Sequence, residues 1–295
     1  MPKALQLAWI VPGTLLVVLL FAMFPAVLHS DPMDGVLHVD WKNGFSSIRD
    51  YVEGFGNGQA FRYLSGSNEL SFWSQIGDSF SITLFYMAVG ALAGITIGVL
   101  LGVYFAVSRA AWLKRILELT SVLPDFVIVL LLQFLIVYLA TETGFVFFKV
   151  ASPTMDDPAI ALPLLSTVII PANYMIRNVA LHMNLTLTED YISFAKARGL
   201  GKTYIIFFHA VPNVLPYLKA DLHKFMGILF GNLFIFEYLY NLNGVTLLVF
   251  SNAFAFGNYQ YNLVVNGILT LFVLYAIIFA LLRFFIYGWE KVVVR

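Results

Sequence analysis

Several segments of this chain are too long, too apolar and too free of charge to belong to a water-soluble fold. Residues 79–107 contain no charged side chain. A bilayer core about 30 Å thick is crossed by roughly 20 apolar residues in a helix. The 295 residues are 60% hydrophobic and only 12% charged, unlike those of a soluble domain. We therefore expect an all-α polytopic membrane protein with six transmembrane helices, at about residues 5–28, 79–107, 119–140, 159–179, 218–240 and 262–286.

The first apolar segment has two interpretations, because Lys3 precedes it as it would in a secretory signal peptide. The apolar run of 5–28 is longer than the usual core of about 7–15 residues, and no A-x-A cleavage site follows, so we expect a retained membrane helix. Residues 29–72 are polar and form either a small folded cap or an interfacial loop. We therefore divide the chain into 1–78, the first transmembrane helix and its external loop, and 79–290, the transmembrane core.

The basic residues are distributed unevenly between the two sides that six spans define. With both ends inside, only Lys42, Arg49, Arg62 and Lys149 of the 17 basic residues fall outside. Cytoplasmic loops of membrane proteins carry an excess of Lys and Arg. We therefore place both termini, the basic turn around Arg109, Lys114 and Arg115, and the segment after the fourth span in the cytoplasm.

Glycine recurs at every fourth position of the second span. This spacing places the four residues in one stripe, where another helix can approach closely. The stripe predicts either packing within the chain or contact with another subunit, and glycine spacing does not separate the two. Its members are Gly90, Gly94, Gly98 and Gly102.

Among the polar residues within the apolar spans, three are candidates for a solute path. Asp125 lies near the start of the third span, and Asn232 and Glu237 lie inside the fifth. A carboxylate at the bilayer centre costs about 2.5–3.5 kcal/mol on insertion scales, so it faces protein, water or the interface. For Asp125, a structural or interfacial role and a place along a solute path both stay open. Arg177 is expected at the exit of the fourth span, where its side chain reaches the headgroups.

The cytoplasmic segment after the fourth span predicts a short helix. Thr186 and Glu189 fit a T-x-x-E capping box, which closes a helix start through two side chains. Gly199 occupies the position where a left-handed residue ends many helices. We therefore expect one helix over about 187–198. A face of this helix at positions i, i+3, i+4 and i+7 is formed by Tyr191, Phe194, Ala195 and Arg198.

Such a short amphipathic helix has three possible locations. It could lie in the headgroups, pack on its own bundle, or insert into a groove on a soluble partner. The basic residues Lys196, Arg198 and Lys202 suit the first location as well as the third.

The letters of this segment resemble those of a known family. The run A-K-A-R-G-L, followed by His209 and Pro212, resembles the EAA motif of ABC-importer permeases. The branch it resembles most handles dipeptides, oligopeptides and nickel, and the likeness includes Asn213 and Pro216 and covers roughly residues 80–285. The sequence departs from that branch in the turn after Glu237, where it reads EYLYNLNGV.

This resemblance implies a transmembrane permease subunit of an ATP-driven importer for peptides or a similar solute, in a bacterial inner membrane. It implies a second permease, two cytoplasmic ATP-binding subunits that receive the 187–198 coupling helix, and an external solute-binding protein. The chain itself would be non-catalytic and without cofactor, with ATP bound by the partners. The coupling residues implied are Tyr191, Ala195, Lys196, Ala197, Arg198 and Gly199; residues of the path would be Asp125, Asn232 and Glu237.

Two other classes of function compete with this interpretation. In a secondary transporter, Asp125, Glu237 or His223 would relay protons or coordinate ions. An intramembrane enzyme is disfavoured, because the sequence has neither an H-E-x-x-H nor a G-x-S-x-G motif and no cysteine. It also has no G-x-x-x-x-G-K-[ST] phosphate loop, so we expect no nucleotide site in this chain.

Overall fold

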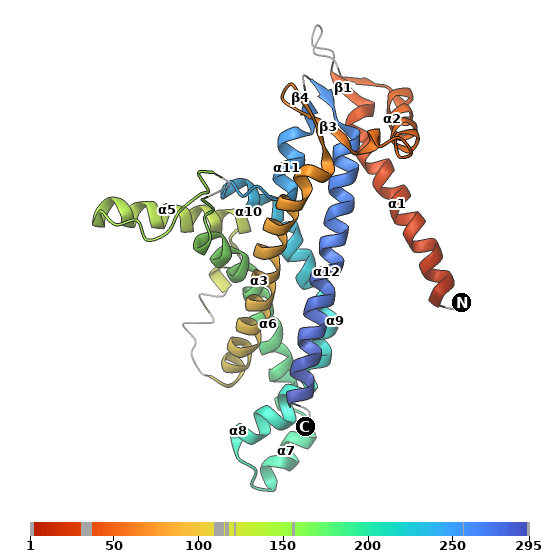
Figure 1. Ribbon diagram of the computed structural model, residues 1–295. Helices are drawn as coiled ribbons and strands as arrows, with labels where there is room; N and C mark the ends of the chain where they lie inside the picture. The colour runs from red at the N-terminus through yellow and green to blue at the C-terminus, as the bar shows by residue number, and fades with distance from the viewer. Residues whose placement is uncertain are drawn as a thin grey trace. The chain divides into compact units, whose positions relative to one another are not determined.

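The computed structural model describes residues 3–30, 37–108, 115, 118–120, 122–154, 157–255 and 257–293. Arg109 and Lys114 of the predicted basic turn lie outside these residues. Helices dominate the chain (Figure 1). Its residues divide into two compact units. Unit 1 comprises 1–81 and 243–274, and unit 2 comprises 82–242 and 275–295. Residues 243–274, which we assigned to the transmembrane core, thus group with the N-terminal part.

Unit 1 begins with an apolar helix that packs against an amphipathic one. Asp40 caps the second helix, because its carboxylate accepts hydrogen bonds from the backbone N–H groups of Lys42 and Asn43. The buried Tyr51 hydroxyl donates to Asn266 Oδ1 over 2.9 Å, which fastens this helix to the start of α12. The elements of this part are α1 (Lys3–Val27), β1 (Leu28–Ser30), β2 (Leu37–Val39) and α2 (Trp41–Gly54).

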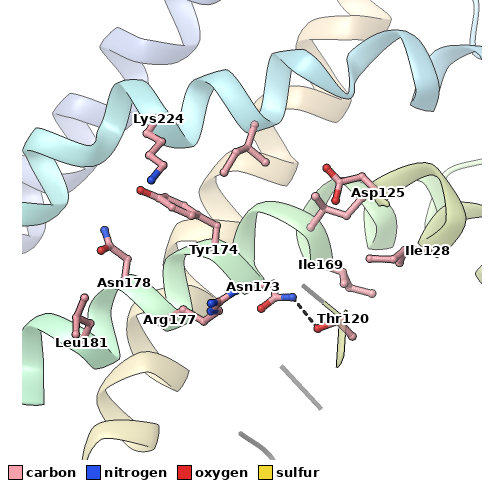
Figure 2. A pocket seen from close by; sticks show the side chains of 12 residues that line it. Thr120, Asp125, Ile128, Ile169, Asn173, Tyr174, Arg177, Asn178, Leu181 and Lys224 are labelled. Carbon is pink, nitrogen blue, oxygen red and sulfur yellow. Dashed lines mark hydrogen bonds between the residues drawn. The ribbon is translucent and has the colours of Figure 1, made fainter. Parts of the chain in front are cut away.

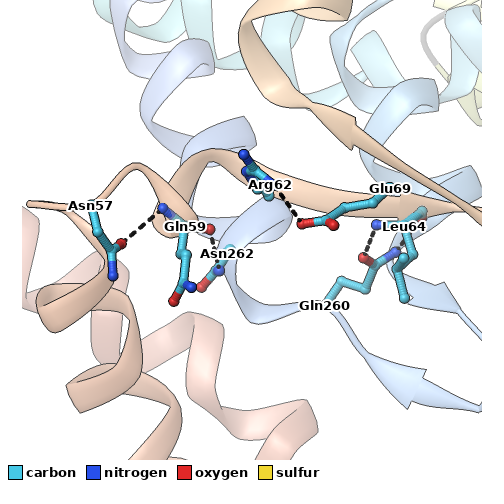
Figure 3. A network of polar contacts seen from close by, with 7 residues as sticks. All are labelled: Asn57, Gln59, Arg62, Leu64, Glu69, Gln260 and Asn262. Carbon is cyan, nitrogen blue, oxygen red and sulfur yellow. Dashed lines mark hydrogen bonds and ion pairs between the residues drawn. The ribbon is translucent and has the colours of Figure 1, made fainter.

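A β-hairpin completes the polar part of unit 1. The side-chain amide of Gln260 forms two hydrogen bonds with the backbone of Leu64 in this hairpin, as a neighbouring strand would. Its Oε1 accepts from Leu64 N at 2.5 Å, and its Nε2 donates to Leu64 O at 2.7 Å (Figure 3). Residues 37–72 are therefore folded as a small cap. The elements here are η1 (Gln59–Phe61), β3 (Arg62–Ser65), β4 (Asn68–Ser71), α11 (Val245–Asn252), β5 (Phe254–Ala255) and β6 (Asn258–Tyr259).

Unit 2 is built around two paired helices, α6 and α9. The helices α3 (Phe72–Val107) and α12 (Tyr261–Val293) each contribute a part of their length to both units. The other elements are α5 (Asp125–Thr143), α6 (Ala161–Leu187), α7 (Asp190–Ala197), α8 (Lys202–Ile205), the π-helix η2 (Ile206–Ala210), α9 (Val211–Gly231) and α10 (Leu233–Leu239).

The glycine stripe of α3 packs within the chain, against α6. A Cβ atom built on Gly98 would lie 2.5 Å from Met175 Cβ, and one on Gly102 would lie 2.6 Å from Val179 Cβ. Real Cβ atoms do not approach so closely, so the two helices meet only because these side chains are absent. Of the two uses that the spacing left open, the structure shows the intrachain one.

In the part of the chain that the structure describes, five helices are long and apolar enough to cross a membrane. The predicted fifth span, 218–240, is not one continuous helix: α9 ends at Gly231 and α10 begins at Leu233. Asn232 lies between them with φ −95° and ψ −4°. The five apolar helices are Trp9–Val27, Phe72–Val107, Asp125–Thr143, Ala161–Leu187 and Tyr261–Lys291.

Candidate functional site

We call residues 188–210, between α6 and α9, the connector. Its first helix begins at a different residue, and with a different cap, from those predicted. Thr186 is still inside α6 and only 7% exposed, so its hydroxyl cannot cap the next helix. Glu189 is the residue that precedes α7, with φ −66° and ψ 149°, and makes no side-chain cap. The predicted capping box is therefore wrong, and the helix covers Asp190–Ala197 rather than 187–198.

The end of α7 follows its prediction. Gly199 has φ +78°, the left-handed conformation that favours glycine. Its N–H donates to Lys196 O at 2.9 Å, and the N–H of Leu200 donates to Ala195 O at 3.3 Å. These are the two hydrogen bonds of a Schellman motif. The glycine therefore reverses the chain and lets α8 fold back towards α7.

A small apolar core holds α7 and α8 together. Ile192 and Ala195 of α7 are buried against Ile205 of α8, with Leu187 and Leu200 packed beside them. Ala195 thus faces the interior of the connector. The four residues expected to share one face do not share one environment: Ala195 is buried, whereas Tyr191, Phe194 and Arg198 are exposed. The connector is consequently a folded hairpin of two helices rather than one isolated helix.

The outer surface of the connector is aromatic and cationic. Phe194 is 65% exposed, and the Arg198 guanidinium carbon lies 5.9 Å from the centroid of its ring. Tyr204 stacks on Phe208 with ring centroids 4.7 Å apart. The side chains of Lys196 and Ala197 also face outward. The exposed aromatic residues of the connector are Tyr191, Phe194, Tyr204, Phe207 and Phe208.

Tyr191 of α7 lies near Asn213 in the first turn of α9. Partial burial, with a further contribution from the Glu189 carboxylate, raises the pKa of its phenol, and the nearby Asn213 amide acts in the opposite direction. The Asn213 amide donates to the His209 carbonyl oxygen at 2.7 Å, inside the π-helix η2. The connector therefore continues into α9 through a hydrogen-bonded, helical segment.

Two of the three predicted path residues lie together. Asn232 Nδ2 donates to Asp125 Oδ2 at 2.7 Å and to the Ile228 carbonyl oxygen at 2.9 Å. This pair joins the start of α5 to the break between α9 and α10. Glu237 lies elsewhere, 1% exposed, and accepts a hydrogen bond of 2.6 Å from the Thr83 hydroxyl of α3.

A polar cavity of about 590 Å³ lies beside Asp125, between α5, α6 and α9 (Figure 2). Sequence reasoning missed most of its lining. Arg177 was expected at a helix exit, but α6 continues for ten residues beyond it, to Leu187. A signal was present, because Asn173 and Arg177 are i, i+4 neighbours in an apolar span. The polar side chains of the lining are Thr120, Asp125, Asn173, Tyr174, Arg177, Asn178 and Lys224.

His223, a candidate in the secondary-transporter hypothesis, does not line this cavity. Its Nδ1 lies 3.0 Å from the Tyr275 hydroxyl, and its ring stacks on Phe279 at 4.5 Å. Among the described residues, no cluster of three or more His, Asp or Glu side chains could hold a metal ion.

Apolar helices of membrane-spanning length and a polar cavity define a polytopic helical membrane protein. Residues 94–295 match the model of a family described as the inner membrane component of binding-protein-dependent transport systems. The chain belongs to this family.

Two further comparisons agree with this membership. A protein of Brucella suis biovar 1 (strain 1330) that bears the name peptide permease is 26% identical over 175 residues, which cover 57% of this chain and 55% of that protein. The chain thus matches about half the length of this curated relative. A solved structure of the MetNI methionine ABC transporter, in an inward-facing conformation, shares the fold with a TM-score of 0.50 at 16% identity. That alignment covers 76% of this chain and 98% of the other.

Proposed function

We propose that this chain is a transmembrane permease subunit of an ATP-driven importer, with oligopeptides or dipeptides as its solute. It works beside a second permease, above two cytoplasmic ATP-binding subunits, and receives solute from an external binding protein. The family match and the peptide permease name of the relative support this proposal. The chain lies in a bacterial inner membrane with both termini in the cytoplasm.

The connector carries this proposal. Exposed aromatic and Arg side chains are the groups that most often dominate the energy of protein interfaces. In the connector they stand on a hairpin whose own core, formed by Ile192, Ala195 and Ile205, is buried. Such a rigid projection can be held in a cleft of an ATP-binding subunit and can transmit its movement. In this proposal the ATP-binding subunit contacts the exposed Lys196, Ala197 and Arg198. The buried Ala195 and the left-handed Gly199 determine the shape of the hairpin.

Movement of the connector would reach the cavity through α9. The segment η2 continues directly into this helix, and α9 contributes Lys224 and Ile228 to the cavity lining. Its far end is fastened to α5 by the hydrogen bond between Asn232 and Asp125. A tilt of α9 would therefore change the width of the cavity while this bond serves as a pivot. In this proposal α9 and α10 together make the fifth of the six crossings, and Glu237 lies on the path beyond the break.

An experiment on Phe194 tests the proposed contact. The change Phe194→Glu places a charge on the exposed connector surface without touching the core of the hairpin. Loss of a central interface aromatic costs about 2 kcal/mol or more, which weakens binding roughly 30-fold. We expect the ATP-binding subunits to be lost during co-purification, and ATP-driven uptake to fall with them.

Phe45→Glu is the matched control, because Phe45 is 57% exposed on α2 of unit 1. This variant should keep the ATP-binding subunits. If the Phe194→Glu complex co-purifies intact and transports normally, the connector is not the contact.

A further inference from the structure

Two cationic side chains of the polar cavity lack an anionic partner. Lys224 Nζ lies 5.2 Å from the centroid of the Tyr174 ring, a cation–π contact (Figure 2). Arg177, on the same helix as Tyr174, also lines the cavity. Neither side chain forms an ion pair with any residue that the structure describes. Two cations without an ion-pair partner therefore line one space; the carboxylate of Asp221, three residues before Lys224, is engaged by Asn178 and His182 instead.

Both cations lie well inside their helices rather than at the helix ends. Arg177 lies ten residues before the end of α6, about 15 Å along the helix, and Lys224 lies thirteen residues after the start of α9. Lys219, one turn earlier on α9, is neutralised by Glu290 at 2.5 Å. Ionisable residues within membrane helices usually face the interior of the helix bundle or a water-filled cavity, where they often belong to a solute path.

The negative charge of the cavity lining comes from a different helix than the two cations. Asp125 lies at the start of α5, where its carboxylate accepts from the Asn232 amide. Neutral hydrogen-bonding side chains, among them Asn173 and Asn178, occupy the α6 wall. The lining thus offers cationic donors from α6 and α9 and a carboxylate from α5, which together match a solute that carries both charges.

We propose that Arg177 and Lys224 form a station that binds a carboxylate of the transported solute, while Asp125 faces its cationic end. This inference rests on the proposed import function and narrows its substrate class to dipolar solutes with a free carboxylate. A guanidinium binds a carboxylate through two parallel hydrogen bonds, and an ammonium adds a point charge. The cation–π contact keeps the Lys224 ammonium group oriented without neutralising it.

Uptake of two probes by the complete transporter tests this station. The chain is reconstituted in liposomes with its second permease, ATP-binding subunits and binding protein, and the probes are dialanine and its C-terminal amide. Loss of a hydrogen bond to a charged group changes binding by about tenfold or more. We expect Arg177→Gln and Lys224→Gln to lower kcat/KM for dialanine by that factor and to leave uptake of the amide unchanged. Because the binding protein is the same throughout, its own preference cancels between variant and wild type.

Lys291→Gln is the matched control, since Lys291 Nζ also lies over a tyrosine ring, 4.9 Å from the centroid of Tyr287, but outside the cavity lining. This variant should leave the uptake of both probes unchanged. Equal losses for both probes in the Arg177 and Lys224 variants, or no loss, would overturn the station, because the cations would then contact lipid or another subunit. A wild-type complex without ATP-dependent dialanine uptake would instead reject the peptide-import function on which the station rests.

Discussion

The packing of Ile205 against α7 gives a quantitative test of the rigidity of the connector. Ile205 is 3% exposed and contacts a core of only a few residues. The change Ile205→Ala removes three carbon groups, each worth about 0.8 kcal/mol when buried, and leaves a cavity. We expect a total cost of about 2–4 kcal/mol, confined to the hairpin of α7 and α8. The exposed residues proposed to meet the ATP-binding subunits stay unchanged.

Amide hydrogen exchange of the purified transporter measures this cost directly. Local opening controls exchange, so a loss of 2 kcal/mol should speed exchange in 190–205 about 30-fold, with the transmembrane helices unaffected. ATP hydrolysis should continue while uptake falls, because a loosened hairpin transmits less movement. Ile205→Val is the control and should cost about 0.5–1.5 kcal/mol. Unchanged exchange in the Ile205→Ala variant would refute the reasoning that this core holds the connector in shape.

Three further changes test other parts of the structure. Gly98→Leu should overpack the contact between α3 and α6 and lower the free energy of unfolding by about 1–3 kcal/mol, which a lower Tm in detergent would show. Gly227→Leu is its control and should leave the Tm unchanged, since no atom lies within 4 Å of a Cβ built there. Gln260→Ala should speed proteolysis of the β3–β4 hairpin, because it removes two hydrogen bonds to the β3 edge. Asn232→Leu should lower the free energy of unfolding by about 1–3 kcal/mol, since the Asp125 carboxylate loses a donor; a Tm equal to that of wild type would show that the bond does not fasten the helix break.

Features that depend on local sequence were predictable. The uncharged run of 79–107 defines a membrane helix by composition alone, and the structure has a helix over Phe72–Val107. Gly199 ends α7 in the left-handed conformation, as its position indicated, because glycine adopts it at little steric cost. The T-x-x-E pattern was misleading, since burial of Thr186 among the α6 residues outweighs a capping bond at the surface.

Features that depend on pairing of distant segments were not predictable. The break in the expected 218–240 span occurs where Asn232 bonds to Asp125, a residue 107 positions away in the chain. The cavity needs α6 and α9 to pack side by side before Arg177 and Lys224 can face the same space. Their polarity within apolar spans identified Asp125 and Asn232 as candidates for the solute path. It did not indicate that the two side chains form a hydrogen bond with each other.

The energy source of transport tests the proposed role of this chain most directly. Uptake is measured in liposomes that contain the complete transporter, with ATP supplied on the side of the ATP-binding subunits and without an ion gradient. We predict uptake that requires ATP and stops when the ATP-binding subunits are left out or the Phe194→Glu change is made. Uptake by this chain without those subunits, driven by a proton gradient, would contradict the proposal and identify a secondary transporter.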